Sequence, residues 1–135
     1  MNNNIFPDGK KINVEICGKL MELEICSTLN SQLKGYKKIN EEPKENEGKL
    51  FVFNTEKILS FWMKDVIFDL DIIFFDSKLN YINHYTMKKM VSEHNSNIPK
   101  YVSKKPAMFA IEIKPEWCNQ NGVDYSCKLK FIFNN

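Results

Sequence analysis

The 135-residue chain contains no arginine, and all 19 of its strongly basic residues are lysines. Proteins that recognise nucleic-acid bases commonly use arginine, which forms bidentate hydrogen bonds with guanine and with phosphate. The net charge is only +2, because 17 acidic residues are interleaved with the lysines, so no wide basic face is expected. Both shortages argue against nucleic acid as a partner.

Long apolar runs and glycine clusters are also missing. No stretch approaches the roughly 18 apolar residues that a membrane-spanning helix needs. The first five residues do not form a signal peptide, so we expect a cytoplasmic protein if the chain is complete. A secreted or periplasmic protein is expected if a signal peptide was removed. The five glycines are isolated from one another, which excludes a glycine-rich phosphate loop.

Metal and nucleophile motifs are scarce as well. Four cysteines are present, none in a C-x-x-C pair: Cys17, Cys26, Cys118 and Cys127. We therefore predict no metal and no other cofactor. Four free thiols are the expected state, and a Cys17–Cys26 bridge is disfavoured because a tight hairpin would place these residues at its opposite ends. If a disulfide forms, it should join an N-terminal cysteine to a C-terminal one.

The two histidines, His84 and His94, offer little support for catalysis. A Ser-His-Asp site would need a nucleophile such as Ser103 together with an oxyanion loop. No nucleophile elbow or glycine-rich oxyanion loop is present. We expect neither histidine to be catalytic.

Alternation of apolar and polar residues predicts a mainly β fold. Residues 11–17 and 20–26 alternate on either side of Gly18-Lys19, which is typical of a hairpin. A short helix is expected after Ser27 or Thr28 as N-cap, and a second between Pro115 and Gly122. Further strands are expected over residues 50–53, 58–63, 66–75, 81–85, 107–113 and 128–133, with a polar break at 54–57 and polar loops at 37–48 and 88–105. The prediction is a single domain over 1–135, a β-sandwich or barrel-like sheet pair with one or two short helices.

Two of these strands carry charges inside apolar runs. In the strand after residue 69, Asp71 shares a face with Ile73 and Phe75, opposite Leu70, Ile72 and Phe74. In the strand over 107–113, Glu112 faces away from Phe109, Ile111 and Ile113. The apolar run over residues 66–75, rich in Ile and Phe, favours a strand that is buried on both faces, whereas residues 107–113 alternate between two faces.

Several motifs follow one another in a recognisable order. The chain reads Gly48-Lys49-Leu50-Phe51-Val52-Phe53, then Phe61-Trp62-Met63-Lys64, then Leu70-Asp71-Ile72-Ile73-Phe74, then Tyr101-Val102-Ser103 and a strand that ends near Glu112. Over residues 11–133 this pattern resembles the domain of unknown function 192 family. The resemblance implies a small β-rich domain with a helix or two, and no established activity.

The chain also departs from that family pattern. Where the family usually has Gly-Leu-Met-Phe-Arg, this chain has Gly35-Tyr36-Lys37-Lys38 and no arginine. The usual Asn-Thr after the tryptophan motif is Asp65-Val66, and the usual proline is Asp69. The resemblance therefore implies that a site using the arginine or the Asn-Thr pair is altered here, since lysine does not reproduce the hydrogen-bonding geometry of arginine.

The candidate pocket is built from the motif residues that carry polar or aromatic groups. They are Trp62, Met63, Lys64, Asp71, Tyr101, Ser103 and Glu112. Each has a plainer interpretation. Lys64 and Asp71 could form a salt bridge between strand ends, and Trp62 or Met63 could belong to the core. Tyr101 and Ser103 could form hydrogen bonds with backbone groups of their loop, and Glu112 could be exposed.

The leading hypothesis for function is a monomeric ligand-binding or protein-interaction module without catalytic chemistry, whose partner is a small ligand or a protein. The alternative is a small enzyme in which Asp71 or Glu112 acts as general acid or base beside Lys64. It requires two carboxyl groups that converge on one cleft. A third hypothesis is a structural partner that offers an exposed β edge or an apolar patch.

Overall fold

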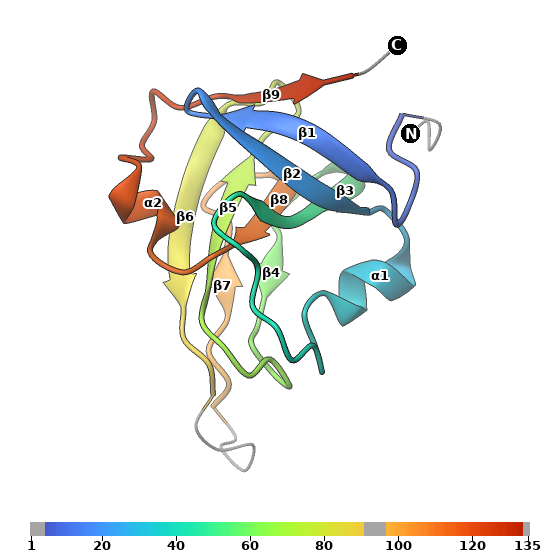
Figure 1. The fold of residues 1–135 in the computed structure, drawn as a ribbon, viewed down its shortest axis with the longest axis vertical. Coiled ribbons are helices and arrows are strands. Elements are labelled where there is room, and N and C mark those ends of the chain that lie inside the picture. Colours follow the sequence, from blue (N-terminus) through green and yellow to red (C-terminus); the bar gives the residue numbers. More distant parts are fainter. Residues whose placement is uncertain (1–4, 91–96, 134–135) are drawn as a thin grey trace.

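The computed structural model describes residues 5–90 and 97–133 (Figure 1). Its helices are α1 (Leu29–Lys34) and α2 (Trp117–Gln120), and its strands are β1 (Lys11–Ile16), β2 (Lys19–Cys26), β3 (Glu47–Lys57), β4 (Ser60–Phe61), β5 (Leu70–Phe75), β6 (Tyr81–Met87), β7 (Tyr101–Val102), β8 (Ala107–Ile113) and β9 (Leu129–Ile132). One curled sheet has the strand order β6-β5-β8-β3-β2-β1-β9, and β4 pairs with β7 in a small second sheet. The predicted mainly β fold with two short helices is confirmed.

The predicted N-terminal hairpin and first helix are both present. Strands β1 and β2 pair antiparallel, and Cys17 and Gly18 at the turn both have positive φ, as a type I′ turn requires. Helix α1 has Thr28 as N-cap, whose side chain accepts from the backbone of Ser31. The Gln32 amide donates to the Val52 carbonyl at 2.6 Å, which ties this helix to β3.

The curled sheet is buried on both faces at its centre. Every residue of β5 is buried, as predicted for this run. Leu70, Ile72 and Phe74 pack into one apolar cluster on the side of β4, whereas Ile73 and Phe75 pack into the other. The prediction of which β5 residues share a face is therefore confirmed.

Some strand limits differ from the prediction. The polar break expected at residues 54–57 is wrong, because β3 continues to Lys57, where it pairs with Ala107 after a register shift. These residues are exposed, so a strand that projects from the sheet has no apolar alternation to reveal it. The strand expected over 58–63 is reduced to Ser60–Phe61, and β5 begins at Leu70 rather than at residue 66.

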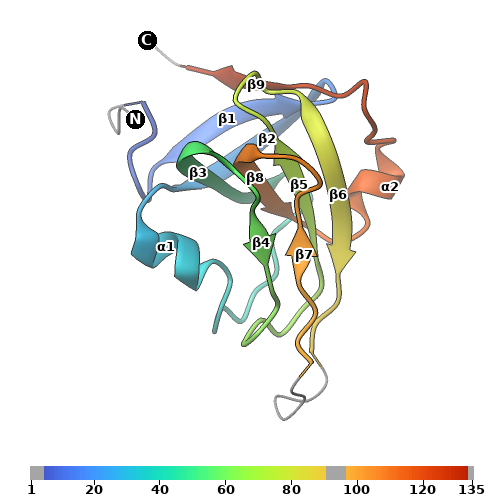
Figure 2. The ribbon, with the colours of Figure 1, turned by 180° about the vertical axis from the view of Figure 1, so that it is seen from behind.

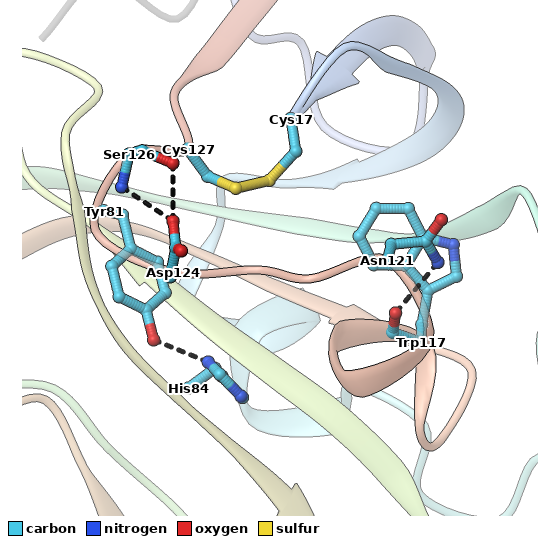
Figure 3. The surroundings of a disulfide bond; sticks show 8 residues. All are labelled: Cys17, Tyr81, His84, Trp117, Asn121, Asp124, Ser126 and Cys127. Carbon is cyan, nitrogen blue, oxygen red and sulfur yellow. Dashed lines mark hydrogen bonds between the residues drawn. A yellow bond between two sulfur atoms is a disulfide. The ribbon is translucent and has the colours of Figure 1, made fainter.

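The expectation of four free thiols is wrong for two of the cysteines. Cys17 and Cys127 form a disulfide with a Cα–Cα distance of 4.6 Å (Figure 3). The bridge joins the β1–β2 turn to the segment before β9, because β9 pairs with β1. It therefore links an N-terminal cysteine to a C-terminal one, as expected for any bridge. Cys26 and Cys118 are free and buried.

The expected polar loop at 88–105 is only partly described, and it contains β7. His94 lies outside the described residues. In the part of the chain that is described, no helix combines the length and the apolar character needed to cross a membrane.

Candidate functional site

Helix α1, β3 and β4 can be followed in Figure 2. Residues of these elements line a cavity of about 310 Å³. Its lining residues come from α1 and the turn after it, from β3, from the β4 segment and from one position of β8. They are Leu29, Gln32, Leu33, Lys34, Gly35, Tyr36, Lys37, Phe51, Phe53, Lys57, Ile58, Leu59, Ser60, Phe61, Trp62, Val66 and Glu112. The volume is at the lower end of the range for small-molecule sites.

Exposed apolar side chains surround this cavity. Helix α1 has no buried residue, and its two leucines, Leu29 and Leu33, are 71% and 61% exposed. Ile58 and Trp62 are also exposed on the wall opposite. Large apolar side chains that gather at one concave surface are typical of a binding site.

Glu112 supplies the one carboxyl group in the lining of this cavity. Its side chain is 5% exposed, and among the described residues it has no hydrogen bond or ion pair. No fully buried polar side-chain atom in the described part lacks a partner, so the carboxyl oxygens open onto the cavity. Burial raises the pKa of Glu112 to about 8, although the charge of Lys49 acts in the opposite direction.

Lys49, the cation whose charge acts on Glu112, forms no ion pair with it among the described residues. Lys49 is opposite Glu112 in the β3–β8 register, but its ammonium lies 2.6 Å from the Glu24 carboxylate. The same ammonium lies 5.0 Å from the centre of the Tyr36 ring. Burial first, and then the charge of Glu112, raises the pKa of the Tyr36 hydroxyl. Lys49 is thus already engaged, and the Glu112 carboxyl remains available to a ligand.

Gly35 allows the chain to pass close to this carboxyl group. Gly35 has a backbone φ of +46°, a conformation that residues with a side chain rarely adopt. A Cβ atom at this position would lie 3.6 Å from Glu112 Oε1 and 3.5 Å from the Phe51 ring. The turn that ends α1 therefore forms one wall directly beside Glu112.

Trp62 is the second predicted site residue that lines the cavity. Lys64 does not line it, but its ammonium lies 5.6 Å from the centre of the Trp62 ring. Met63 points away and is buried in the cluster beneath β4. The alternation of side chains in this segment thus gives Trp62 to the cavity and Met63 to the core, as the two-face prediction allowed.

Asp71 lies on the opposite face of the sheet. Ile72 is paired with Glu112, so Asp71 points to the side on which α2 packs. Its carboxylate accepts hydrogen bonds from the backbone of Glu116 and Cys118 at 2.9 Å each, and from the Thr86 hydroxyl at 2.7 Å. Asp71 therefore holds the start of α2, and the expected salt bridge with Lys64 is not formed.

Ser103 and Tyr101 support the cavity wall from outside. The Ser103 hydroxyl accepts from the Leu59 backbone at 2.9 Å, and the Ser103 amide donates to the Leu59 carbonyl at 2.9 Å. The Tyr101 hydroxyl accepts from the Lys88 backbone at 3.3 Å, while its ring packs against Tyr85. Of the seven predicted residues, the structure therefore brings Trp62 and Glu112 into the cavity lining and the others to positions around or behind it.

Sequence reasoning missed the contribution of α1 and the turn after it. The available signal was the apolar pair Leu29 and Leu33, four positions apart on a helix too short to bury them. His84 lies elsewhere, 2.6 Å from the Tyr81 hydroxyl near the disulfide (Figure 3). The described residues contain no group of three or more histidine, cysteine or acidic side chains arranged to hold a metal.

Comparisons with known proteins agree with this fold. Residues 12–131 match the family DUF192, described as Uncharacterized ACR. A "putative transcription regulator" from Sinorhizobium meliloti 1021 has a TM-score of 0.78 and 19% identity, covering 92% of this chain and 95% of its own. A protein of unknown function from Novosphingobium aromaticivorans DSM 12444 has a TM-score of 0.75 and 21% identity. The match covers 89% of this chain and 84% of that protein's chain. At such identities the two structures show the fold alone. No curated protein matches the chain.

Proposed function

This chain belongs to the DUF192 family, and because that family's description names no activity, we propose a function from the cavity itself. The domain binds a small, largely apolar molecule between α1 and β4, and Glu112 meets a polar group of that molecule. The proposal is a binding function, without chemistry performed on the ligand.

The observation that carries the proposal is the state of Glu112. Glu112 is only 5% exposed as a residue, and its carboxyl oxygens, which open onto the cavity, have no protein partner among the described residues. A carboxyl group that has lost most of its solvent and gained no protein partner costs free energy in the unliganded fold. A ligand that brings a hydrogen-bonding group to this carboxyl offsets that cost. The apolar walls formed by Leu33, Phe53 and Ile58 favour an apolar body for the rest of the molecule.

The geometry gives less support to the enzyme hypothesis. General acid–base catalysis by a pair of carboxyl groups needs both of them near the reacting atoms. Asp71 and Glu112 face opposite sides of the sheet, and Asp71 is occupied by the start of α2. A single carboxyl group in an apolar cavity is better suited to recognition.

The test uses N-phenyl-1-naphthylamine, a neutral apolar dye with one N–H donor whose fluorescence rises on binding. We expect Leu33→Ala to weaken dye binding, whereas Leu20→Ala should leave it unchanged. Leu20 is a matched control, because it is 60% exposed on β2 and lies outside this cavity. Equal effects of both substitutions, or no binding to the native chain, would contradict the proposal.

A second pair of variants tests the role of Glu112. Glu112→Gln keeps a carbonyl acceptor in place and should bind the dye about as well as the native chain. Glu112→Leu removes the acceptor and should weaken binding about fivefold, the usual effect of one hydrogen bond. If the leucine variant bound the dye as tightly as the glutamine variant, Glu112 would have no part in recognition.

A further inference from the structure

Trp62 is a partly exposed residue of the cavity lining, which places it at the mouth, and three lysine side chains lie near its ring. The ammonium groups of Lys37, Lys64 and Lys100 lie 5.6, 5.6 and 4.9 Å from the centre of its ring. They come from three separate segments of the chain: the turn after α1, the segment after β4 and the segment before β7. The fold therefore gathers three positive charges around one partly exposed aromatic side chain.

These charges have no acidic partner in the described structure. The ion pairs found there involve other lysines, namely Lys11, Lys49 and Lys88. Two further lysines, Lys34 and Lys57, line the same cavity. The only carboxyl group in the lining is Glu112, which is buried and whose raised pKa makes it mostly neutral at pH 7. The mouth is thus positive, although the chain as a whole carries a net charge of only +2.

Ammonium groups that gather around one ring repel one another, and the indole ring compensates for only part of this repulsion. An anion placed among them would be attracted by all three charges. It would also be close to the apolar cavity that begins at Trp62.

From this arrangement we propose that the natural ligand is an amphipathic anion. Its apolar body fills the cavity between α1 and β4, and its carboxylate, sulfonate or similar acidic group lies among Lys37, Lys64 and Lys100 beside Trp62. This inference rests on the proposed function, since it assigns a charge to the molecule that the cavity binds.

The experiment compares two dyes that share one carbon skeleton. 1-Anilinonaphthalene-8-sulfonate carries an anionic sulfonate, and N-phenyl-1-naphthylamine lacks it. In the triple variant Lys37→Gln, Lys64→Gln and Lys100→Gln, we expect the affinity for the sulfonate dye to fall about tenfold, because three exposed charge interactions are lost. The affinity for the neutral dye should fall much less, although Lys37 is part of the cavity lining.

A second triple variant controls for the change in net charge. Lys19→Gln, Lys128→Gln and Lys130→Gln remove the same number of charges from exposed positions in and beside the β1–β2 turn and β9, outside the cavity lining. This variant should bind both dyes as the native chain does. Rising salt should weaken binding of the sulfonate dye to the native chain and leave binding of the neutral dye unaffected.

Three outcomes would overturn the proposal of an anionic ligand. The first is an equal loss of affinity for both dyes in the first triple variant. The second is a loss of affinity for the sulfonate dye in the control variant that is as large as in the first triple variant. The third is a sulfonate dye that binds the native chain no more tightly than the neutral dye does. In each case, binding of the neutral dye that responds to Leu33→Ala would leave the proposed function standing. Failure of the neutral dye to bind the native chain would count against the proposed function itself.

Discussion

The unpaired carboxyl group of Glu112 should make the stability of this protein depend on pH in an unusual direction. Most acidic side chains in folded proteins have partners that lower their pKa, so that folding becomes less favourable as the pH falls. Burial of Glu112 has the opposite effect, because its pKa is raised from 4.5 to about 8. The folded state therefore binds this proton more tightly than the unfolded state does.

The size of the effect follows from this difference in pKa. One pKa unit corresponds to about 1.4 kcal/mol, so the change from 4.5 to about 8 corresponds to about 5 kcal/mol. This contribution to stability is fully present below pH 4.5, is lost progressively between pH 4.5 and 8, and is absent above pH 8. At pH 7 about 3 kcal/mol of it has been lost.

Glu112→Gln isolates this contribution, because glutamine has nearly the same size and hydrogen-bonding capacity but remains neutral. The free energies of unfolding of both proteins are measured in urea from pH 4.5 to pH 9. We expect the variant to gain on the native protein by about 1.4 kcal/mol per pH unit as the pH rises, with a plateau above pH 8. The other charged or titratable groups around the carboxyl, Lys49, Tyr36 and Cys26, are present in both proteins and so cancel in the difference.

Glu45→Gln is the control, because Glu45 is exposed and outside the cavity lining. Its stability relative to the native protein should not vary with pH over this range. The reasoning about Glu112 would be refuted by a difference between Glu112→Gln and the native protein that stays constant within about 1 kcal/mol from pH 5 to 8.5.

Three further predictions concern the frame around the cavity, and urea unfolding measures each change in stability. A Cβ at Gly48 would collide with the Glu112 carbonyl oxygen, so Gly48→Ala should destabilise the fold by roughly 3 kcal/mol or more. Gly9 has open space around it but a φ of +79°, so Gly9→Ala should cost only about 1 kcal/mol, and equal costs would contradict the close approach at Gly48. Asp71→Asn should cost about 3 kcal/mol of stability, because an amide nitrogen replaces one carboxylate oxygen and cannot accept a hydrogen bond from the α2 backbone. Dye binding should stay unchanged, since Asp71 is on the other face of the sheet, and weaker dye binding would contradict that separation. Cys127→Ser removes a disulfide whose cysteines are 110 residues apart in the sequence, and it should cost about 3 kcal/mol of stability. The native chain, unfolded without reductant, should show two reactive thiols, and four would exclude the disulfide.

Much of the fold was predictable because its evidence is local. Alternation over residues 11–17 and 20–26 predicted β1 and β2, and the Gly18 turn between them was confirmed. The apolar run that includes Leu70–Phe75 correctly predicted a strand buried on both faces. The extension of β3 to Lys57 was not predictable in this way, because its exposed polar residues carry no periodic signal.

The candidate site was less accessible to such reasoning. The motifs pointed to Trp62 and Glu112, which the fold brings to one cavity. They did not include α1, whose local signal is limited to two leucines four positions apart on a helix of six residues. The lysines around Trp62 were equally hidden, since Lys37 and Lys100 are far apart in the sequence and meet only in the folded chain.

The sequence by itself determined where most of the strands lie and which of their side chains share a face. It also contains no arginine, which leaves lysine to provide most of the positive charge. Side-chain alternation is a property of a single strand, so it can be read without knowing the neighbours of that strand. Only the tertiary structure decided that Asp71 and Glu112 lie on opposite faces of one sheet, because this depends on the register that pairs Ile72 with Glu112. Another non-local pairing, between β1 and β9, brought Cys17 to Cys127. The packing of α1 beside the sheet left the Glu112 carboxyl open to the cavity.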